Sequence, residues 1–125
     1  MKRVLLGLAM LLAACRAGDA GTTGAGTLTV RLTGGTGNEG AVLVIVSGGS
    51  VASVDVPVGS QVATNTDGAG THIMVMGSLA VGAIATLHVP DLSQASRYVA
   101  TVVQVADRTS YMLLDPMRYQ VTVGQ

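Results

Sequence analysis

The chain has 125 residues, a length that fits one domain of ordinary size better than two. Charged residues make up 11% of it, with seven basic and seven acidic side chains, so it lacks the basic surface on which nucleic-acid binding depends. Phe and Trp are absent and Tyr occurs three times, which disfavours binding of sugar rings or bases on aromatic faces. The apolar fraction of 49% still allows a packed core of Val, Ala, Leu, Ile and Met.

The first fifteen residues combine positive charge, an apolar run and a lone cysteine. Lys2 and Arg3 precede the apolar residues 4–14, which are too few for a transmembrane helix of about 20 residues and are typical of a secretory signal. The stretch Leu12-Ala13-Ala14-Cys15 resembles the lipobox of bacterial lipoproteins. The alternatives are an ordinary cleaved signal with an incidental cysteine and a cytosolic chain with an apolar start.

The lipobox resemblance implies a division of the chain and a location. Residues 1–14 are then a signal peptide, 15–26 a lipidated Cys15 with a flexible Gly, Ala and Thr linker, and 27–125 a β-domain. Cys15 carries palmitate or a similar acyl chain, which removes an unpaired thiol from an oxidising compartment. The resemblance also implies the bacterial cell envelope, and Arg16 after the cysteine favours the outer membrane or its periplasmic face.

The first two strands are predicted from different patterns. Residues 27–33 alternate apolar and polar side chains, which indicates a half-buried strand near a sheet edge. Residues 35–40 match G-x-G-x-x-G, but the β-branched run 41–46 follows where a dinucleotide site needs a helix. We therefore expect a hairpin loop and a buried central strand, and no nucleotide.

Short strands and a turn are expected next. Residues 50–57 alternate up to Pro57, and residues 59–64 are compatible with another strand. Residues 65–70 (NTDGAG) have turn composition. They do not form a calcium loop, because Ala63 and Met74 occupy the first and twelfth ligand positions.

Residues 71–78 and 83–89 read as one β-hairpin. A register in which paired numbers sum to 160 buries one face cleanly and places His72 opposite His88. These two histidines are the candidate ligands for Zn²⁺ or Cu²⁺, although sites normally have three or four ligands, so two solvent-facing histidines are preferred and no metal is assigned. In the same register Met74, Met76 and Ile84 form an apolar outer patch.

The C-terminal third is expected to hold three strands. Asp91 caps a single helical turn, and residues 97–106 form the longest strand, whose apolar residues on both faces favour a central position. Residues 110–114 and 118–123 follow, the last with Tyr119, Val121 and Val123 inward. Surface ion pairs at the strand ends are available to Asp91, Asp107 and Asp115 with Arg97, Arg108 and Arg118.

These elements predict an all-β antiparallel β-sandwich of about eight strands, immunoglobulin-like or cohesin-like, with a partly open barrel as the alternative. The arrangement loosely resembles cohesin-like bacterial surface sandwiches. No acid pair, nucleophile or cofactor motif is found, so we expect no enzyme and no cofactor. The expected function is a lipid-anchored binding or structural module with a membrane contact through the lipid and a protein partner. The alternative is a two-histidine metal-binding or a carbohydrate-binding surface module.

Overall fold

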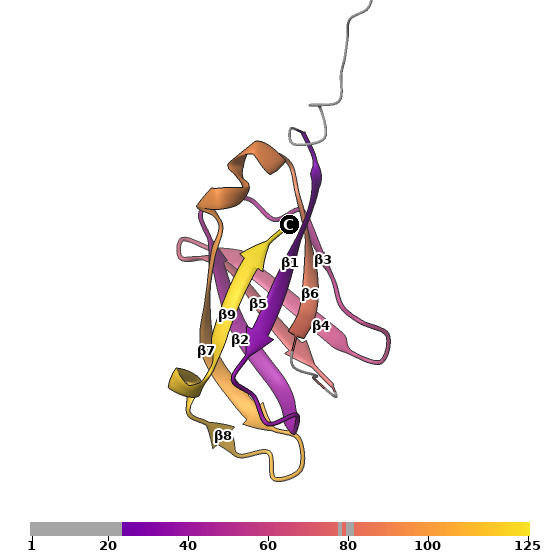
Figure 1. Cartoon of the computed structure of the whole chain (residues 1–125), viewed down its shortest axis with the longest axis vertical. Helices are drawn as coiled ribbons and strands as arrows, with labels where there is room; N and C mark the ends of the chain where they lie inside the picture. Colours follow the sequence, from indigo (N-terminus) through magenta and orange to yellow (C-terminus); the bar gives the residue numbers. More distant parts are fainter. Residues whose placement is uncertain (1–23, 78, 80–81) are drawn as a thin grey trace, which may run out of the picture.

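The chain folds into two antiparallel sheets packed face to face (Figure 1), in a computed structural model that describes residues 24–77, 79 and 82–125. Sheet A has the strand order β3 (Ser53–Asp55), β6 (Gly82–Val89), β1 (Gly26–Thr33) and β9 (Gln120–Gly124). Sheet B has the order β4 (Gln61–Asp67), β5 (Gly70–Met76), β2 (Glu39–Ser47), β7 (Val99–Asp107) and β8 (Leu113–Leu114). Two short 3₁₀ helices, η2 (Leu92–Arg97) and η3 (Pro116–Arg118), connect strands. The predicted all-β sandwich is confirmed.

The core lies between the sheets and is built from alternate residues of each strand. Successive side chains of a strand point to opposite faces, so a period of two sends one set inward. Sheet A contributes Leu28, Val30 and Leu32 of β1, and sheet B contributes alternate residues of β2 and β5, all of them 0–1% exposed. The sheet B set is Val42, Val44, Val46, Ile73 and Val75.

The predicted hairpin of residues 71–78 and 83–89 is wrong. β5 pairs with β2 and β4 in sheet B, whereas β6 pairs with β1 and β3 in sheet A. The two strands therefore lie in opposite layers, and the connection between them crosses from one sheet to the other. Each strand has a regular buried face that fits many partners, so alternation identifies the strands without identifying their neighbours.

A β-bulge in β7 explains why both of its faces carry apolar residues. β2 pairs Leu43 with Gln104 but the next residue, Val44, with Val102, so Val103 is an extra residue. The residues of β7 that point inward are therefore even-numbered up to Val102 and shift by one position after the bulge, where the fully buried Val105 points inward. β7 lies between β2 and β8, so it is an interior strand as predicted, although β8 pairs with only its last part.

Other elements differ in extent. β4 runs on to Asp67, so the turn predicted over 65–70 is only residues 68–69, and the strand predicted over 110–114 has two residues. The predicted cap is confirmed, since the Asp91 carboxylate accepts a hydrogen bond from Ser93 N at 2.9 Å. The last strand begins at Gln120 and not at residue 118, but Tyr119 just before it is buried, and Val121 and Val123 are half-buried, as expected.

The sandwich has two distinct ends. β1 begins and β9 finishes toward one end, which we call the entry end (Figure 1). The opposite end, which we call the far end, carries β8 and the turn after β7 (Figure 1). The two ends and the two outer faces are the surfaces available for function.

Candidate interaction surface

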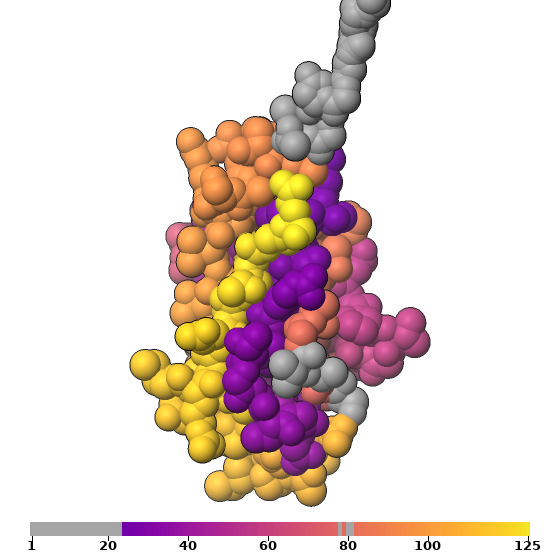
Figure 2. Space-filling view, in the orientation of Figure 1, coloured from indigo at the N-terminus to yellow at the C-terminus, as the bar shows by residue number. Residues whose placement is uncertain are grey.

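The outer face of sheet A, on which β1 and β9 lie side by side (Figure 2), carries mainly polar side chains, and we call it the polar face. Cross-strand pairs on it join Thr29 with Thr86, and Arg31 with Thr122. A polar outer face is the usual condition for an antiparallel sheet with one side in water. The polar side chains on this face, which also carries Ala83, are Thr27, Thr29, Arg31, Thr33, Ser53, Asp55, Thr86, His88, Gln120 and Thr122.

The outer face of sheet B is different, because large aliphatic side chains lie on its solvent side. Leu43 of β2 is paired with Met74 of β5, and Met74 with Ala63 of β4, so apolar groups form a row across three strands. A parallel row joins Met76, Ala41 and Ala106. We call this surface the apolar face and define it by Ala41, Leu43, Ile45, Ala63, Met74, Met76, Ala106 and Leu113, none of which carries a charge.

Three shallow hollows make this surface uneven. Hollows of about 120 and 200 Å³ are both lined by Leu43 and Met74, and they lie toward β7 and β4 respectively. A larger one of about 410 Å³ includes Ala41, Ala106 and Tyr111 in its lining and extends the surface toward the turn after β7. A concave, mostly apolar surface of this kind can receive protruding apolar side chains.

The apolar face continues onto the far end of the sandwich. Four large side chains in and beside β8 and η3 are mainly exposed: Tyr111 at 83%, Met112 at 65%, Leu113 at 67% and Met117 at 88%. Tyr111 also has a φ of 61°, the left-handed region that non-glycine residues rarely adopt. An exposed aromatic side chain held in a strained backbone is a candidate contact residue.

The predicted outer patch is therefore right in part. Met74 and Met76 do lie on an outer face, but Ile84 is 1% exposed in the core, where β6 is irregular against β1. Leu43 and Ile45 belong to the surface and were missed, because the run 41–46 is apolar on both faces and looked fully buried. In the structure burial alternates along that run, so Val42, Val44 and Val46 are buried and the residues between them are half-buried and point outward.

The two candidate metal ligands lie in different sheets. His72 of β5 pairs with Asn65 and Ile45, whereas His88 of β6 pairs with Thr27 and Ser53. The adjacent pair predicted from the hairpin register is thus wrong. Among the residues that the structure describes, no group of three or more His, Cys, Asp or Glu side chains is placed to hold a metal ion.

Each histidine instead contacts an aspartate. His88 Nε2 contacts Asp55 Oδ2 on the polar face. His72 Nε2 lies 3.0 Å from Asp67 Oδ2, but without hydrogen-bond geometry, so the contact is electrostatic when His72 is protonated. Hydrogen bonds from Ala69 N and the contact with His72 lower the pKa of Asp67.

The residue that sequence reasoning missed most clearly is Glu39. It is 1% exposed, and its carboxylate accepts hydrogen bonds from Thr36 N at 2.8 Å, Gly37 N at 2.9 Å and the Tyr119 hydroxyl at 2.8 Å. Burial raises the pKa of Glu39, but these hydrogen bonds outweigh it and lower the pKa to about 2. Burial and the Glu39 carboxylate raise the pKa of Tyr119 to about 12. The backbone amides of the G-x-G-x-x-G loop thus bind the carboxylate of Glu39, a residue of the same loop.

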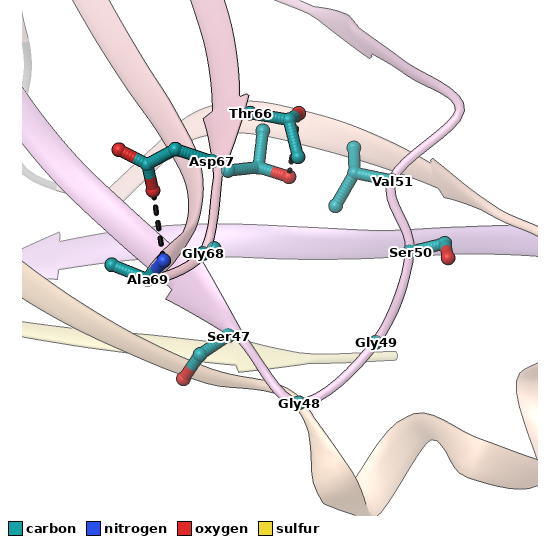
Figure 3. A pocket seen from close by; sticks show the side chains of 11 residues that line it. Ser47, Gly48, Gly49, Ser50, Val51, Thr66, Asp67, Gly68 and Ala69 are labelled. Atoms are coloured by element: carbon teal, nitrogen blue, oxygen red, sulfur yellow. Dashed lines mark hydrogen bonds between the residues drawn. The ribbon is translucent and has the colours of Figure 1, made fainter.

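A hollow of about 390 Å³ opens between the loop after β2 and the β4–β5 turn (Figure 3). Its lining is glycine-rich, with the short polar side chains of Ser47, Ser50, Thr66 and Asp67. Asp67 Oδ1 accepts a hydrogen bond from Ala69 N at 2.8 Å, and Thr66 Oγ1 lies 3.4 Å from Thr71 Oγ1 (Figure 3). These polar groups stabilise the hairpin itself.

Two of the three tyrosines are used inside the fold. Tyr98 donates a hydrogen bond to the Ser50 carbonyl at 2.6 Å, and Tyr119 donates to Glu39. Tyr111 alone presents its ring to solvent. The carboxylates proposed for surface ion pairs act as caps, since Asp107 accepts from Ser110 N and Asp115 from Met117 N.

Cys15, the predicted lipid attachment site, lies outside the described residues. Within residues 24–125, leaving aside the gaps noted above, no helix has the length and apolar character needed to cross a bilayer. Comparison with family models, with curated protein sequences and with solved structures gave no match for this chain.

Proposed function

We propose that the chain is an exported, lipid-anchored β-sandwich lipoprotein that binds a protein partner through its apolar face. The observation that carries the binding role is the composition of the outer face of sheet B. Its rows pair Leu43 with Met74 and Ala41 with Met76 on the solvent side of the sheet, where sheet A has threonines.

The physical argument is that such a surface is unnecessary for folding and costly to leave in water. Burial of apolar area stabilises a contact by about 25 cal/mol per Å², and contiguous exposed apolar patches mark interaction sites in soluble proteins. Methionine suits this role because its flexible, polarizable side chain adapts to different partner shapes. The residues that define the face carry no charge, which lowers the desolvation cost of covering them.

The anchoring part of the proposal rests on the lipobox-like residues 12–15. It is tested by growing expressing cells with labelled palmitate and comparing the chain with the Cys15→Ser variant. We expect label and membrane association in the chain and neither in the variant. An unlabelled, freely soluble chain would refute the anchor.

The binding part is tested by site-specific photo-cross-linking in the same cells. A photoreactive amino acid at Leu43, at the centre of the apolar face, should give a discrete adduct with one protein. The matched probe at Thr29, on the polar face, should give none. The adduct should weaken at least tenfold when Met74→Asp is added, and equal labelling from both probes would exclude the apolar face as the binding site.

A further inference from the structure

The four edge strands of the sandwich are protected to different degrees. β3 and β8 have three and two residues, and Pro57 and Pro116 follow them closely. β9 lies against β7 of the other sheet. Short strands, prolines, charges and bulges are the usual devices that stop an edge from pairing with another chain.

β4 has none of these devices along most of its length. Its seven residues, Gln61–Asp67, are almost all exposed and contain no proline and no basic residue. They pair with β5 without a register shift, so no bulge twists the edge away. Asp67 at the end of the strand is its only charged residue.

The hairpin geometry shows which backbone groups this edge offers. A two-residue loop, Gly68–Ala69, joins the strands, and the flanking residues Asp67 and Gly70 form a hydrogen-bonded pair. Hydrogen-bonded and non-hydrogen-bonded pairs then alternate along the strand. The N–H and C=O groups of Val62, Thr64 and Thr66 consequently point away from β5, toward the open edge.

A second copy of the same strand fits this edge best. Identical antiparallel strands pair across a two-fold axis, where each residue of one copy meets its counterpart reciprocally. With Thr64 on the axis, Thr64 meets Thr64 and Val62 meets Thr66, so all three outward residues form hydrogen-bonded pairs. If the register shifts by two residues, one of the three outward residues in each copy has no partner.

The same register suits the side chains. Ala63 lies opposite Asn65, and Gln61 lies opposite Asp67 of the second copy. The one charge therefore meets an amide that can donate a hydrogen bond to it, and two carboxylates never face each other. A foreign strand would need to supply such a partner at the matching position.

We propose that the chain forms a two-fold symmetric dimer in which β4 pairs antiparallel with β4 of a second copy. About six new backbone hydrogen bonds join the two B sheets into one continuous sheet. The apolar faces of both copies then lie on the same side of that sheet. The proposal depends neither on the lipid anchor nor on a partner at the apolar face.

Cysteine cross-linking of the full chain in expressing cells tests the register. Thr64→Cys places two thiols across the axis, where a hydrogen-bonded pair has its Cα atoms about 5.5 Å apart, within reach of a short bis-maleimide. We expect most of this variant to run at twice the chain mass on a denaturing gel. The matched control is Thr122→Cys, an exposed position on the polar face, which should remain monomeric.

The outcomes separate this proposal from the lipid anchor. Failure of Thr64→Cys to cross-link, or equal cross-linking of Thr122→Cys, overturns the dimer. Cross-linking of the unmodified chain would mean that Cys15 has a free thiol, which refutes the anchor, and the dimer is then decided in a Cys15→Ser background by the same two variants.

A second measurement disrupts the contact without touching the β4–β5 ladder. Proline at position 64 removes an outward N–H that β5 does not use, and proline is tolerated at such edge positions. Thr64→Pro should lower the dimer fraction of detergent-purified full chain at least tenfold by sedimentation velocity, whereas Thr64→Val should keep it. Equal dimer fractions in both variants would rule out pairing through β4.

Discussion

The polar face and the apolar face are built on the same scaffold and differ in the large aliphatic side chains that only the apolar face carries. Both sheets bury regular apolar sets between them, as Val30 does in β1 and Val44 in β2. On the outside, Thr29 is paired with Thr86 in sheet A, whereas Leu43 is paired with Met74 in sheet B. Because the polar face is compatible with a stable sheet, the composition of the apolar face is not a requirement of the fold. It is therefore the observation on which the proposed binding role rests.

If the outer faces serve recognition, the largest losses of stability must come from residues between the sheets. Glu39→Ala should lower the free energy of unfolding by about 3 kcal/mol, since it removes a buried carboxylate and leaves its donors without a partner. Urea unfolding followed by circular dichroism measures it. Gln120→Ala on the polar face should change the free energy of unfolding by less than about 0.5 kcal/mol. A loss as large as that of Glu39→Ala would contradict the claim that stability comes from residues between the sheets.

Acid should weaken the same contact between the sheets. The pKa of Glu39 is about 2 in the folded chain against 4.5 for an ordinary glutamate. A lowered folded pKa adds stability above the unfolded pKa, and that stability is lost as the pH falls from about 4.5 toward 2. The loss attributable to this group is about 3 kcal/mol.

Measuring the free energy of unfolding of the unmodified chain and of Glu39→Gln at several pH values isolates the contribution of the Glu39 carboxylate. The aspartates with lowered pKa values, such as Asp107, act in the same direction in both proteins and cancel in the difference. The stability gap between the two should narrow from pH 5 to pH 2. A gap that stays constant with pH would show that the Glu39 carboxylate does not titrate as described.

Exchanging the chemistry of the two outer faces tests the comparison directly. The double variant Leu43→Thr with Met74→Thr should lower the free energy of unfolding by only about 1 kcal/mol, because threonine suits an exposed strand surface. Fluorescence of a dye that binds apolar surface should fall severalfold. The reverse change, Thr29→Leu with Thr86→Met, should raise the dye fluorescence. Unchanged fluorescence in both variants would mean that the dye does not reach the apolar face.

The smallest expected effect concerns the far end of the apolar face. Tyr111→Gly should raise the free energy of unfolding by about 0.5 kcal/mol, because glycine relieves the strain of a φ of 61° and loses part of that gain through backbone entropy. Partner cross-linking from Leu43 should decrease at the same time. Lower stability, or unchanged cross-linking, would argue against a strained contact residue.

Much of the fold followed from alternation alone, and the errors have one physical origin. The inward residues of β1 and β9 were predictable because burial imposes a period of two. The neighbours of β5 and β6 were not predictable, and the two strands were wrongly paired with each other, since each presents the same kind of apolar row to any neighbour. The extra residue Val103 likewise inverts the faces of β7 in a way that composition does not reveal.

The candidate surface was predictable only in part for a related reason. Met74 and Met76 stand in an alternating strand, so their outward direction was visible once Ile73 and Val75 were placed inside. Leu43 and Ile45 lie in an unbroken apolar run, where the two faces look alike. The burial of Glu39 depends on Tyr119, which is 80 residues away in the sequence, and no local pattern connects them.

The loop around Glu39 has a consequence for small anions. The amides of Thr36 and Gly37 and the Tyr119 hydroxyl form a cradle of donors that the chain fills with its own carboxylate. In a loop with the glycine spacing of a phosphate-binding loop, the Glu39 carboxylate thus occupies these donors. Truncation of the side chain vacates that cradle, so formate or acetate should restore part of the lost stability by chemical rescue.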